Sequence, residues 1–393
     1  MKSLKIREID FLPSRTALFD GEEYLFFSGT SYLGIGHQGE FRAALMEGID
    51  RYGTVFSASR NNNLRLKIYE EAESFIAHWT GAAQALTVTS GLLAGQLAVN
   101  FLKNSQNDKA LKPAFIYAPS AHPAVWEAPP STVFQNRADF EKQIIKTVKK
   151  GKNAPIVIVS NAVDMLKCET FDFSWIKKLP DNQDITLLVD DSHGIGVTGE
   201  NGSGIFKGLK KLTRPNVKII VIASLAKALG IPGGVILSEE KIITAIRNNP
   251  LFVGASPIIP AYLYAFLNTQ ALYDKARQTL AHNIELFTSL LAEVQHNLLL
   301  NKNPKKGKLS LDDLNPFRTP MLNYPVFYTP KNDLFDHLFA NKIFISHFAY
   351  PQPTDPPITR VVLSALHTEK DMTHLVDKII EFYPKPINSR LKV

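Results

Sequence analysis

The chain has 393 residues, of which 45% are hydrophobic and 21% are charged, and its formal net charge is +7 at pH 7. This is an ordinary globular composition, long enough for a large core and two structural lobes. A single cysteine, Cys168, excludes an intramolecular disulfide framework. The charged N-terminal residues lack the apolar region of a signal peptide, and no apolar run reads as a membrane span. We therefore expect a cytoplasmic protein without an integral membrane segment.

The basic residues are dispersed, apart from short clusters at 146–152, 207–211 and 303–308. A nucleic-acid-binding surface would need a denser basic stripe. We expect no nucleic-acid partner, and instead a solvated surface that favours anionic ligands such as phosphorylated cofactors or substrates.

Apolar strands and amphipathic helices alternate over the first two thirds of the chain. The first strand is expected at 24–29, and a helix over 64–81 is predicted to end at Gly81. A strand at 84–91 leads into helical spacing over 92–103. Further strands are expected at 114–119, 155–161, 185–194, 217–224 and 233–238, with a helix at 139–150 between two of them. Nearly continuous apolar strands separated by helices predict an α/β fold with a buried, mostly parallel central sheet and helices on both faces.

After about residue 256 the pattern changes. One long helix is expected over 260–300, followed by a polar, proline-punctuated connector. The last part predicts a smaller α+β domain, with strands at 324–329, 342–348 and 358–365 and a helix at 369–383. We expect an N-terminal segment over 1–40, a large domain over 41–280 and a small C-terminal domain over 281–393.

Polar residues follow two of the predicted strands, where loops of a parallel sheet gather. Asp190 and His193 emerge together in DDSHG, at 190–194. These are ordinary turn residues, but an Asp that directly follows Leu-Leu-Val is expected to be buried and to need a cationic or hydrogen-bonding partner. SGLLAG, at 90–95, opens a helix and offers a hydroxyl and backbone N–H groups to an anion, although small residues are common at such turns.

Lys227 is the single lysine of the apolar, glycine-bearing stretch 221–237. It is either a strand-end lysine that reaches water along its stem, or a lysine whose neutral amine acts as a nucleophile. Ser224, three residues earlier, is a candidate phosphate ligand. Pyridoxal 5′-phosphate (PLP) combines a phosphate, a ring nitrogen that an acid can keep protonated and an aldehyde for the lysine, so it is the cofactor that we expect.

Four motifs, in this order and at this spacing, carry a family resemblance: GLLAGQ, AHPAVW, VDDSHGIGVTGENGSGIF and SLAKALGIPGGVI. Over nearly the whole chain the sequence resembles the α-oxoamine synthases of the type I PLP-dependent transferase fold. That family includes 8-amino-7-oxononanoate synthase of biotin biosynthesis, 2-amino-3-ketobutyrate CoA ligase and serine palmitoyltransferase. The resemblance implies the aspartate-aminotransferase-like fold, with a smaller C-terminal α+β domain.

The resemblance also implies roles for residues around the cofactor. Lys227 would attach the cofactor as a Schiff base and later move the α-proton of the amino acid. Asp190 would pair with the pyridine nitrogen, and His193 would hydrogen-bond the phenolic oxygen or the substrate carbonyl. His122, in AHPAVW, would stack on the ring, although from the residues alone a surface histidine before a proline is equally probable.

The remaining roles concern the cofactor phosphate and the substrate. Ser90, Gly91 and Leu92 would bind phosphate together with Ser224, Leu92 through its backbone only. Ser256 would complete the phosphate site of the neighbouring subunit of a homodimer. Arg360 would hold the substrate carboxylate, a task that suits a planar guanidinium, although elsewhere an edge-strand arginine without a ligand would be the default. No metal is expected.

The implied reaction is the condensation of a small amino acid with an acyl-CoA or another acyl thioester, which gives an α-amino ketone, as in 8-amino-7-oxononanoate synthase. Two alternatives stay open. One is another PLP reaction without a thioester, such as amino transfer or aldol cleavage. The other is a non-catalytic PLP-binding protein.

The sequence departs from the family pattern around the cofactor. Thr30 stands where the family has an asparagine, and Ala118 where it has an aspartate. A glutamate-led family segment appears here as residues 160–167, which begin with Ser160 and place Asp164 where the family has a serine. A carboxylate at that position would change the local electrostatics.

Overall fold

The computed structural model describes residues 6–104, 112–130, 134, 136–149, 154–164, 168–300, 317, 323–350, 352 and 354–382. The chain divides into two compact units. The larger unit comprises Ile35–Met165 and Glu169–Asp274, and the smaller comprises Met1–Gly34, Leu166–Cys168 and Lys275–Val393. The basic cluster at 303–308 lies outside the described residues.

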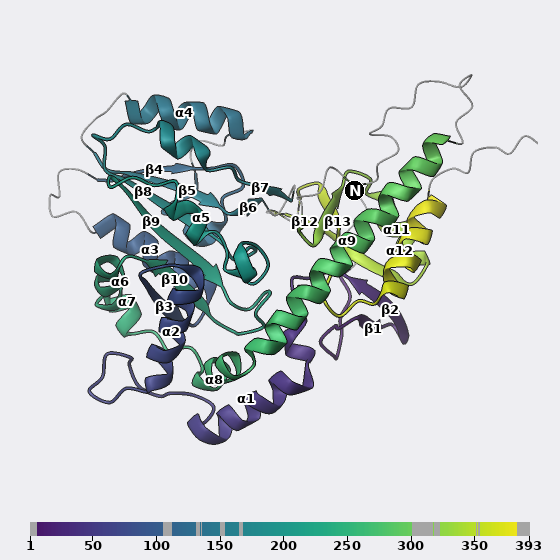
Figure 1. Cartoon of the computed structure of the whole chain (residues 1–393), viewed down its shortest axis with the longest axis horizontal. Coiled ribbons are helices and arrows are strands. Elements are labelled where there is room, and N and C mark those ends of the chain that lie inside the picture. Colours follow the sequence, from purple (N-terminus) through teal and green to yellow (C-terminus); the bar gives the residue numbers. More distant parts are fainter. Residues whose placement is uncertain are drawn as a thin grey trace, which may run out of the picture. The chain divides into compact units, whose positions relative to one another are not determined.

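A six-stranded sheet forms the centre of the larger unit (Figure 1). Its strand order is β3-β10-β9-β8-β5-β4, and β10 is antiparallel to both of its neighbours while the other pairs are parallel. All six strands lie where the sequence predicts them. Their bounds are β3 (Gln84–Val88), β4 (Ala114–Tyr117), β5 (Ile156–Asn161), β8 (Ile185–Asp190), β9 (Val217–Ser224) and β10 (Gly234–Ser238). A short hairpin, β6 (Val163–Asp164) and β7 (Glu169–Thr170), follows β5.

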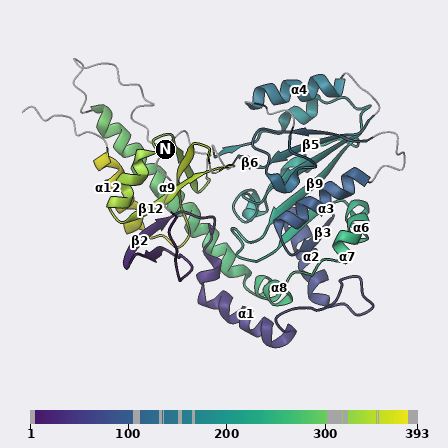
Figure 2. The same cartoon turned by 180° about the vertical axis from the view of Figure 1, so that it is seen from behind.

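Helices cover both faces of this sheet (Figures 1 and 2). Apolar residues of α3 (Gly91–Asn104) and α6 (Glu240–Arg247) form one buried cluster with Leu86 and Val88 of β3. Thr87, between those two residues, bonds instead to Glu73 of α2 (Lys67–Thr80). Because side chains alternate along a strand, α2 packs on the face opposite to α3. The unit also contains α1 (Gly39–Tyr52), α4 (Arg137–Lys149), α5 (Phe206–Lys210), α7 (Pro250–Val253) and α8 (Pro260–Asn268).

Two helix ends differ in how well the sequence specifies them. Gly81 ends α2 in the left-handed conformation, with φ of 75°, as predicted. The single helix predicted over 260–300 is wrong, because the chain leaves helical geometry at Thr269 and forms α8 and α9 (Gln270–Leu300) instead. The Thr269 hydroxyl bonds to the Ala265 carbonyl, a local alternative to the backbone ladder that sequence periodicity does not reveal.

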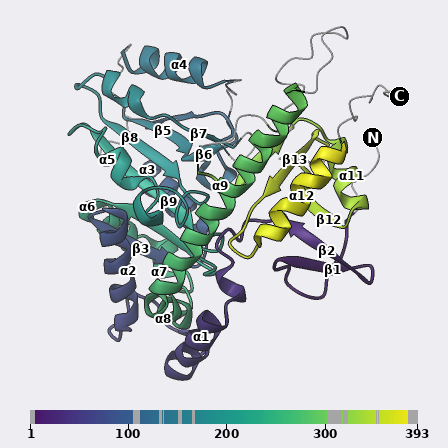
Figure 3. The ribbon, with the colours of Figure 1, turned by 45° about the vertical axis from the view of Figure 1, so that its right-hand side comes forward.

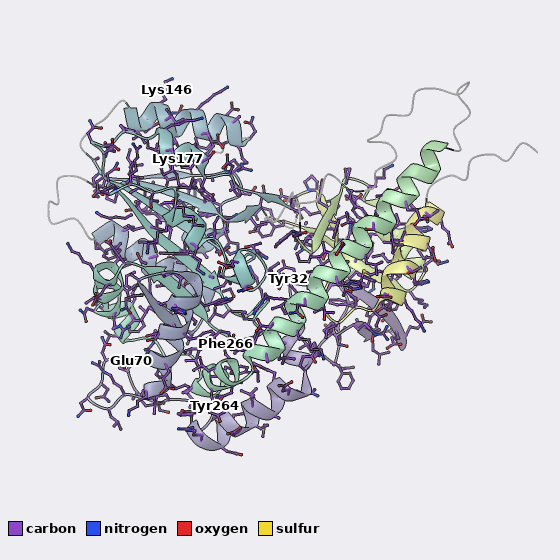
Figure 4. The ribbon with its side chains drawn as sticks, in the orientation of Figure 1. Tyr32, Glu70, Lys146, Lys177, Tyr264 and Phe266 are labelled. Carbon is purple, nitrogen blue, oxygen red and sulfur yellow. The ribbon has the colours of Figure 1, made fainter. Side chains whose placement is uncertain are left out.

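Aromatic side chains anchor α8 within the larger unit (Figure 4). Phe266 is buried, and its ring centroid lies 5.5 Å from that of Phe75 on α2. Tyr264, two residues earlier, donates its hydroxyl to Glu47 of α1. Figure 4 also labels Lys146 and Lys177, which are both exposed, as expected for a solvated basic surface.

The smaller unit is built on a five-stranded sheet in the order β1-β2-β12-β13-β11. The N-terminal strands β1 (Thr16–Phe19) and β2 (Glu22–Phe27) join it, and β2 pairs in parallel with β12 (Ile343–Ala349). The strands β11 (Val326–Thr329) and β13 (Pro357–Val362) complete the sheet. The helices α9, α11 (Asp333–Ala340) and α12 (Glu369–Phe382) run along the same side of it (Figure 3). No helix among the residues with described placement is long and apolar enough to cross a membrane.

Candidate active site

The candidate residues of the larger unit gather at one edge of its sheet. Ser90 follows β3, Asp190 ends β8, and Ser224 ends β9 with Lys227 three residues beyond. These three strands run in the same direction, so their carboxyl ends meet at one edge, where ligands bind in open α/β sheets. The loop that carries His122 follows β4 and reaches the same edge.

Lys227 and His193 form the central contact. The Nζ atom of Lys227 lies 2.6 Å from Nε2 of His193, which is hydrogen-bonding distance. Both side chains are half-buried, and the lysine is flanked by buried Leu225, Ala228 and Leu229. The amine therefore meets an imidazole nitrogen in a partly apolar setting, where a proton can pass between the two groups.

Asp190 is buried, as its position after a run of apolar residues predicts, with 8% of its surface exposed. Its Oδ1 accepts the backbone N–H of Ser192 at 2.9 Å. Its Oδ2 lies 3.9 Å from Nδ1 of His122. A carboxylate in this position is suited to a cationic N–H partner, since a buried negative charge needs compensation.

His122 presents a neutral imidazole. Its Nδ1 accepts the backbone N–H of Ala124 at 3.1 Å, so the ring proton of the neutral form sits on Nε2. Burial lowers the pKa of His122 most strongly; Asp190 opposes this shift and Lys227 adds to it. Half of the side chain, 49%, remains exposed, which leaves the ring available to a ligand.

The start of α3 and the end of β9 form a cradle for an anion. Ser90 caps the helix, because its Oγ accepts the N–H of Leu93 at 3.1 Å. A Cβ atom on Gly91 would lie 2.7 Å from Cβ of Ser224, so only glycine lets the two segments touch. The Ser224 N–H donates to Ser192 Oγ at 2.8 Å, which ties this cradle to the Asp190 loop. Leu92 is 61% exposed, consistent with a contribution through its backbone alone.

This cradle fits a phosphorylated cofactor. Helix α3 has 14 residues, and its first turn carries the positive end of the helix dipole. The Ser224 side chain lies against that turn, at Gly91. The cradle suits the phosphate of PLP, the Lys227 amine suits its aldehyde, and the Asp190 carboxylate suits its ring nitrogen.

Two further candidate residues stand in other elements of the fold. Ser256 is exposed in the loop before α8. Arg360 belongs to the smaller unit, where it is 7% exposed and its guanidinium lies 5.1 Å from the ring centre of Phe348. Its neighbour Val361 pairs with Phe327, which packs on Phe287 of α9, so Arg360 faces the side of the small sheet opposite to α9.

The positions that depart from the family pattern are distributed over both units. Thr30 is half-buried in the smaller unit, in the turn before Tyr32. Ala118 and Ser160 are buried in the larger unit, and the Ser160 hydroxyl donates to the carbonyl of Asn161. Asp164 is buried in β6, opposite Glu169 of β7.

Sequence reasoning assigned no role to two polar residues of the site. Asn161, at the end of β5, hydrogen-bonds to the loop that carries His122. Asp191 is 2% exposed, and its Oδ2 accepts the N–H of Ile205 at 2.8 Å. Burial raises the pKa of Asp191 to about 7, because it disfavours the charged form. The only sequence signal was that both residues stand at strand ends.

Among the described residues no group of three or more His, Cys, Asp or Glu side chains could hold a metal ion.

The protein family of the chain follows from its match to a family model. The model of the aminotransferase class I and II family matches residues 28–379. The chain belongs to this family.

Its relatives extend over nearly the same length. An 8-amino-7-oxononanoate synthase of Fervidobacterium nodosum is 24% identical and covers 95% of this chain and 92% of its own. A second one, of Aliivibrio fischeri, is 26% identical over 93% of this chain and 91% of its own.

Solved structures agree on the fold. A serine palmitoyltransferase of Sphingomonas wittichii superposes with a TM-score of 0.73 at 16% identity, covering 96% of this chain and 93% of its own. An 8-amino-7-oxononanoate synthase of Francisella tularensis gives a TM-score of 0.60 at 21% identity, covering 91% and 97%. The family resemblance and the type I PLP fold predicted from the motifs are therefore confirmed.

We predict that Asp191 makes the stability of this family member dependent on pH. The ordinary pKa of an Asp is about 3.9, so between about pH 4 and 7 the folded chain holds a proton that the unfolded chain has lost. Because of the Asp191 carboxyl, the free energy of unfolding falls as the pH rises over that interval, by up to about 4 kcal/mol. Asp191→Asn should remove this dependence.

Urea unfolding at pH 5 and pH 8 measures this pH dependence of the free energy of unfolding. The variant should gain stability relative to the wild type at the higher pH, whereas Asp184→Asn, at the exposed residue directly before β8, should behave like the wild type. An identical pH dependence in the wild type and Asp191→Asn would contradict the assignment.

Proposed function

We propose that the chain is a PLP-dependent acyltransferase that condenses a small amino acid with an acyl-CoA or another acyl thioester. The observation that carries the proposal is the Lys227–His193 contact of 2.6 Å at the sheet edge where Asp190 and the α3 cradle also lie. The names of its relatives, 8-amino-7-oxononanoate synthase at 24–26% identity over most of the chain, support this substrate class.

Four groups of the larger unit would hold the cofactor. Lys227 would attach it covalently, and Asp190 would face its ring nitrogen. His122, neutral and half-exposed, would cover one face of the ring. Ser90, Gly91, Leu92 and Ser224 would bind the phosphate through two hydroxyls and the N–H groups of the first turn of α3. When bound, PLP supplies an electron-withdrawing ring that stabilises negative charge at the α-carbon of an amino acid.

The chain's own groups would then handle the proton and the substrate. The Lys227 amine is assigned to take the α-proton, and His193, within hydrogen-bond distance, would exchange a proton with it or bond to the substrate carbonyl. Arg360 would hold the amino-acid carboxylate, because its planar fork matches two carboxylate oxygens. The dispersed basic surface would suit the phosphates of an acyl-CoA.

We propose further that two copies of the chain form a homodimer, in which Ser256 serves the phosphate site of the partner subunit. Large apolar side chains of the larger unit are exposed next to the loops involved: Val55, Leu64, Leu92, Leu251 and Val253. Burial of such surface stabilises association.

Sedimentation equilibrium should give the mass of two 43.8-kDa chains. The mass of one chain would contradict the proposed homodimer.

One observation favours a second candidate, amino transfer, since the matching family model is described as aminotransferase class I and II. The two reactions differ in their need for a thioester. An assay with glycine, alanine and serine, with and without acyl-CoA, separates them. Release of free CoA that requires an amino acid identifies the acyltransferase, whereas transfer of the amino group to an added 2-oxo acid without any thioester identifies amino transfer.

Lys227→Ala should abolish covalent attachment of PLP and the release of CoA, because no other amine is assigned to the aldehyde. Borohydride reduction followed by peptide mass spectrometry should find the cofactor on the Lys227 peptide of the wild type. The control is Lys218→Ala, which removes a lysine from the other end of β9, where Nζ pairs with Asp184 at 3.1 Å. This control should keep the adduct. An adduct in Lys227→Ala would refute the assignment.

Arg360→Ala should raise the KM for the amino acid by roughly tenfold or more, since it removes a charge-assisted carboxylate contact. Arg360→Lys should recover only part of the loss, because an ammonium lacks the bidentate fork. The PLP dissociation constant serves as the internal control and should stay unchanged in both variants. If the KM of Arg360→Ala equals that of the wild type, Arg360 does not bind the substrate carboxylate.

A further inference from the structure

Asn161 is a buried polar residue that the proposed chemistry leaves unused. It ends β5 and is 7% exposed. In the sheet register it stands opposite Asp190, and the next N–H, that of Ala162, donates to the Asp190 carbonyl at 2.8 Å. Asn161 is therefore fixed to the strand that carries the carboxylate of the candidate site.

The Asn161 amide uses both of its polar atoms on the loop after β4. Its Nδ2 donates to the Ser120 carbonyl at 2.7 Å, and its Oδ1 accepts the N–H of His122 at 3.1 Å. A single side chain thus holds the backbone on both sides of Ala121. A buried amide with both ends satisfied specifies one arrangement of the groups that it joins.

The conformation of this loop needs such a restraint. Ser120 has φ of 59°, in the left-handed region that residues with a side chain rarely adopt. Backbone strain of this kind persists only where the surrounding structure enforces it. Ala118, which precedes this turn, has no polar side chain to contribute. The Trp126 indole N–H donates to the Ala121 carbonyl at 2.9 Å, so it holds the same loop from the other side.

The other side of His122 is held against α3. The His122 Nδ1 accepts the N–H of Ala124, and Gln96 of α3 donates to the Ala124 carbonyl at 2.9 Å. A Cβ on Gly95 would lie 2.2 Å from that carbonyl, so the helix can approach only because the residue is glycine. With Asn161 on one side and α3 on the other, the direction of the imidazole is determined.

We propose that Asn161 is a positioning residue that fixes the His122 ring relative to Asp190 and so shapes the face of the PLP site. This inference rests on the proposed function, because it assigns His122 to the cofactor. The path of hydrogen bonds is short: Asp190 pairs with Asn161 in the sheet, and the Asn161 amide holds the backbone of His122. The 3.9 Å separation of His122 Nδ1 and Asp190 Oδ2 is set by this path.

The test compares three variants by their binding of PLP. Asn161→Ala removes both hydrogen bonds, and Asn161→Asp keeps an acceptor for the His122 N–H but loses the donor to Ser120. Asn216→Ala is the matched control, because the Asn216 amide also joins two backbone groups, here the carbonyls of Pro180 and Gln183 at 2.9 and 2.8 Å, but at the opposite end of the sheet. The readouts are the PLP dissociation constant, the circular dichroism of the bound cofactor, and thermal unfolding without cofactor.

Asn161→Ala should weaken PLP binding by roughly tenfold or more. It should also change the circular dichroism of the cofactor, because the His122 imidazole that would cover PLP is no longer held in one orientation. Asn161→Asp should lie between this variant and the wild type. Asn216→Ala should lower the unfolding temperature and leave both cofactor readouts unchanged. If Asn161→Ala does not fold, the comparison of Asn161→Asp with Asn216→Ala decides.

Wild-type affinity and dichroism in the Asn161 variants would overturn the inference. An equal effect of Asn216→Ala on cofactor binding would also overturn it, because the role would then be general stability. A wild-type protein that binds no PLP would refute the proposed function itself, and that failure is visible before any variant is measured.

Discussion

Three backbone segments approach one another closely at the edge of the large sheet, and the candidate site depends on this approach. A Cβ on Gly234 would lie 2.3 Å from the Ser90 carbonyl, and one on Gly91 would lie 2.7 Å from Ser224. The start of α3, the end of β9 and the start of β10 therefore meet without side chains between them. This contact places the first turn of α3, with the positive end of its helix dipole, beside the loop that carries Lys227. Larger residues at either glycine would separate the anion cradle from the amine.

A buried charge network keeps β3, and with it the start of α3, in place. Glu73 is 4% exposed and accepts bonds from Arg60 at 2.6 and 3.1 Å and from Arg247 at 3.2 Å. It also accepts the N–H and the hydroxyl of Thr87, three residues before Ser90. The network joins α2, α6 and the loop before α2 to one strand. These five hydrogen bonds to the carboxylate, three of them from guanidinium groups, compensate its burial.

Two kinds of feature are predictable from the sequence. One is a strand or helix whose apolar pattern reflects its burial, and the other is a functional residue of a type that is unusual beside such a pattern. Continuous apolar runs predict the six strands of the larger unit, and Asp190, His193 and Lys227 stand out because ionisable residues are unusual beside such runs. Other features depend on contacts between distant segments. The antiparallel direction of β10 does not alter its apolar pattern. The roles of Asn161 and Asp191 follow from residues 39 and 14 positions away in the chain, which no local pattern reveals.

The pairing of β2 with β12 has a consequence for how the chain is made. Leu25 pairs with Ile343, so the sheet of the smaller unit joins residues from opposite ends of the sequence. The larger unit is nearly contiguous in sequence, since Ile35–Met165 and Glu169–Asp274 are separated by three residues alone. During synthesis on the ribosome this stretch can acquire its core first, since its contacts are complete before β11, β12 and β13 have emerged. The strands β1 and β2, although translated earliest, must wait with an unpaired edge until nearly the whole chain has been made.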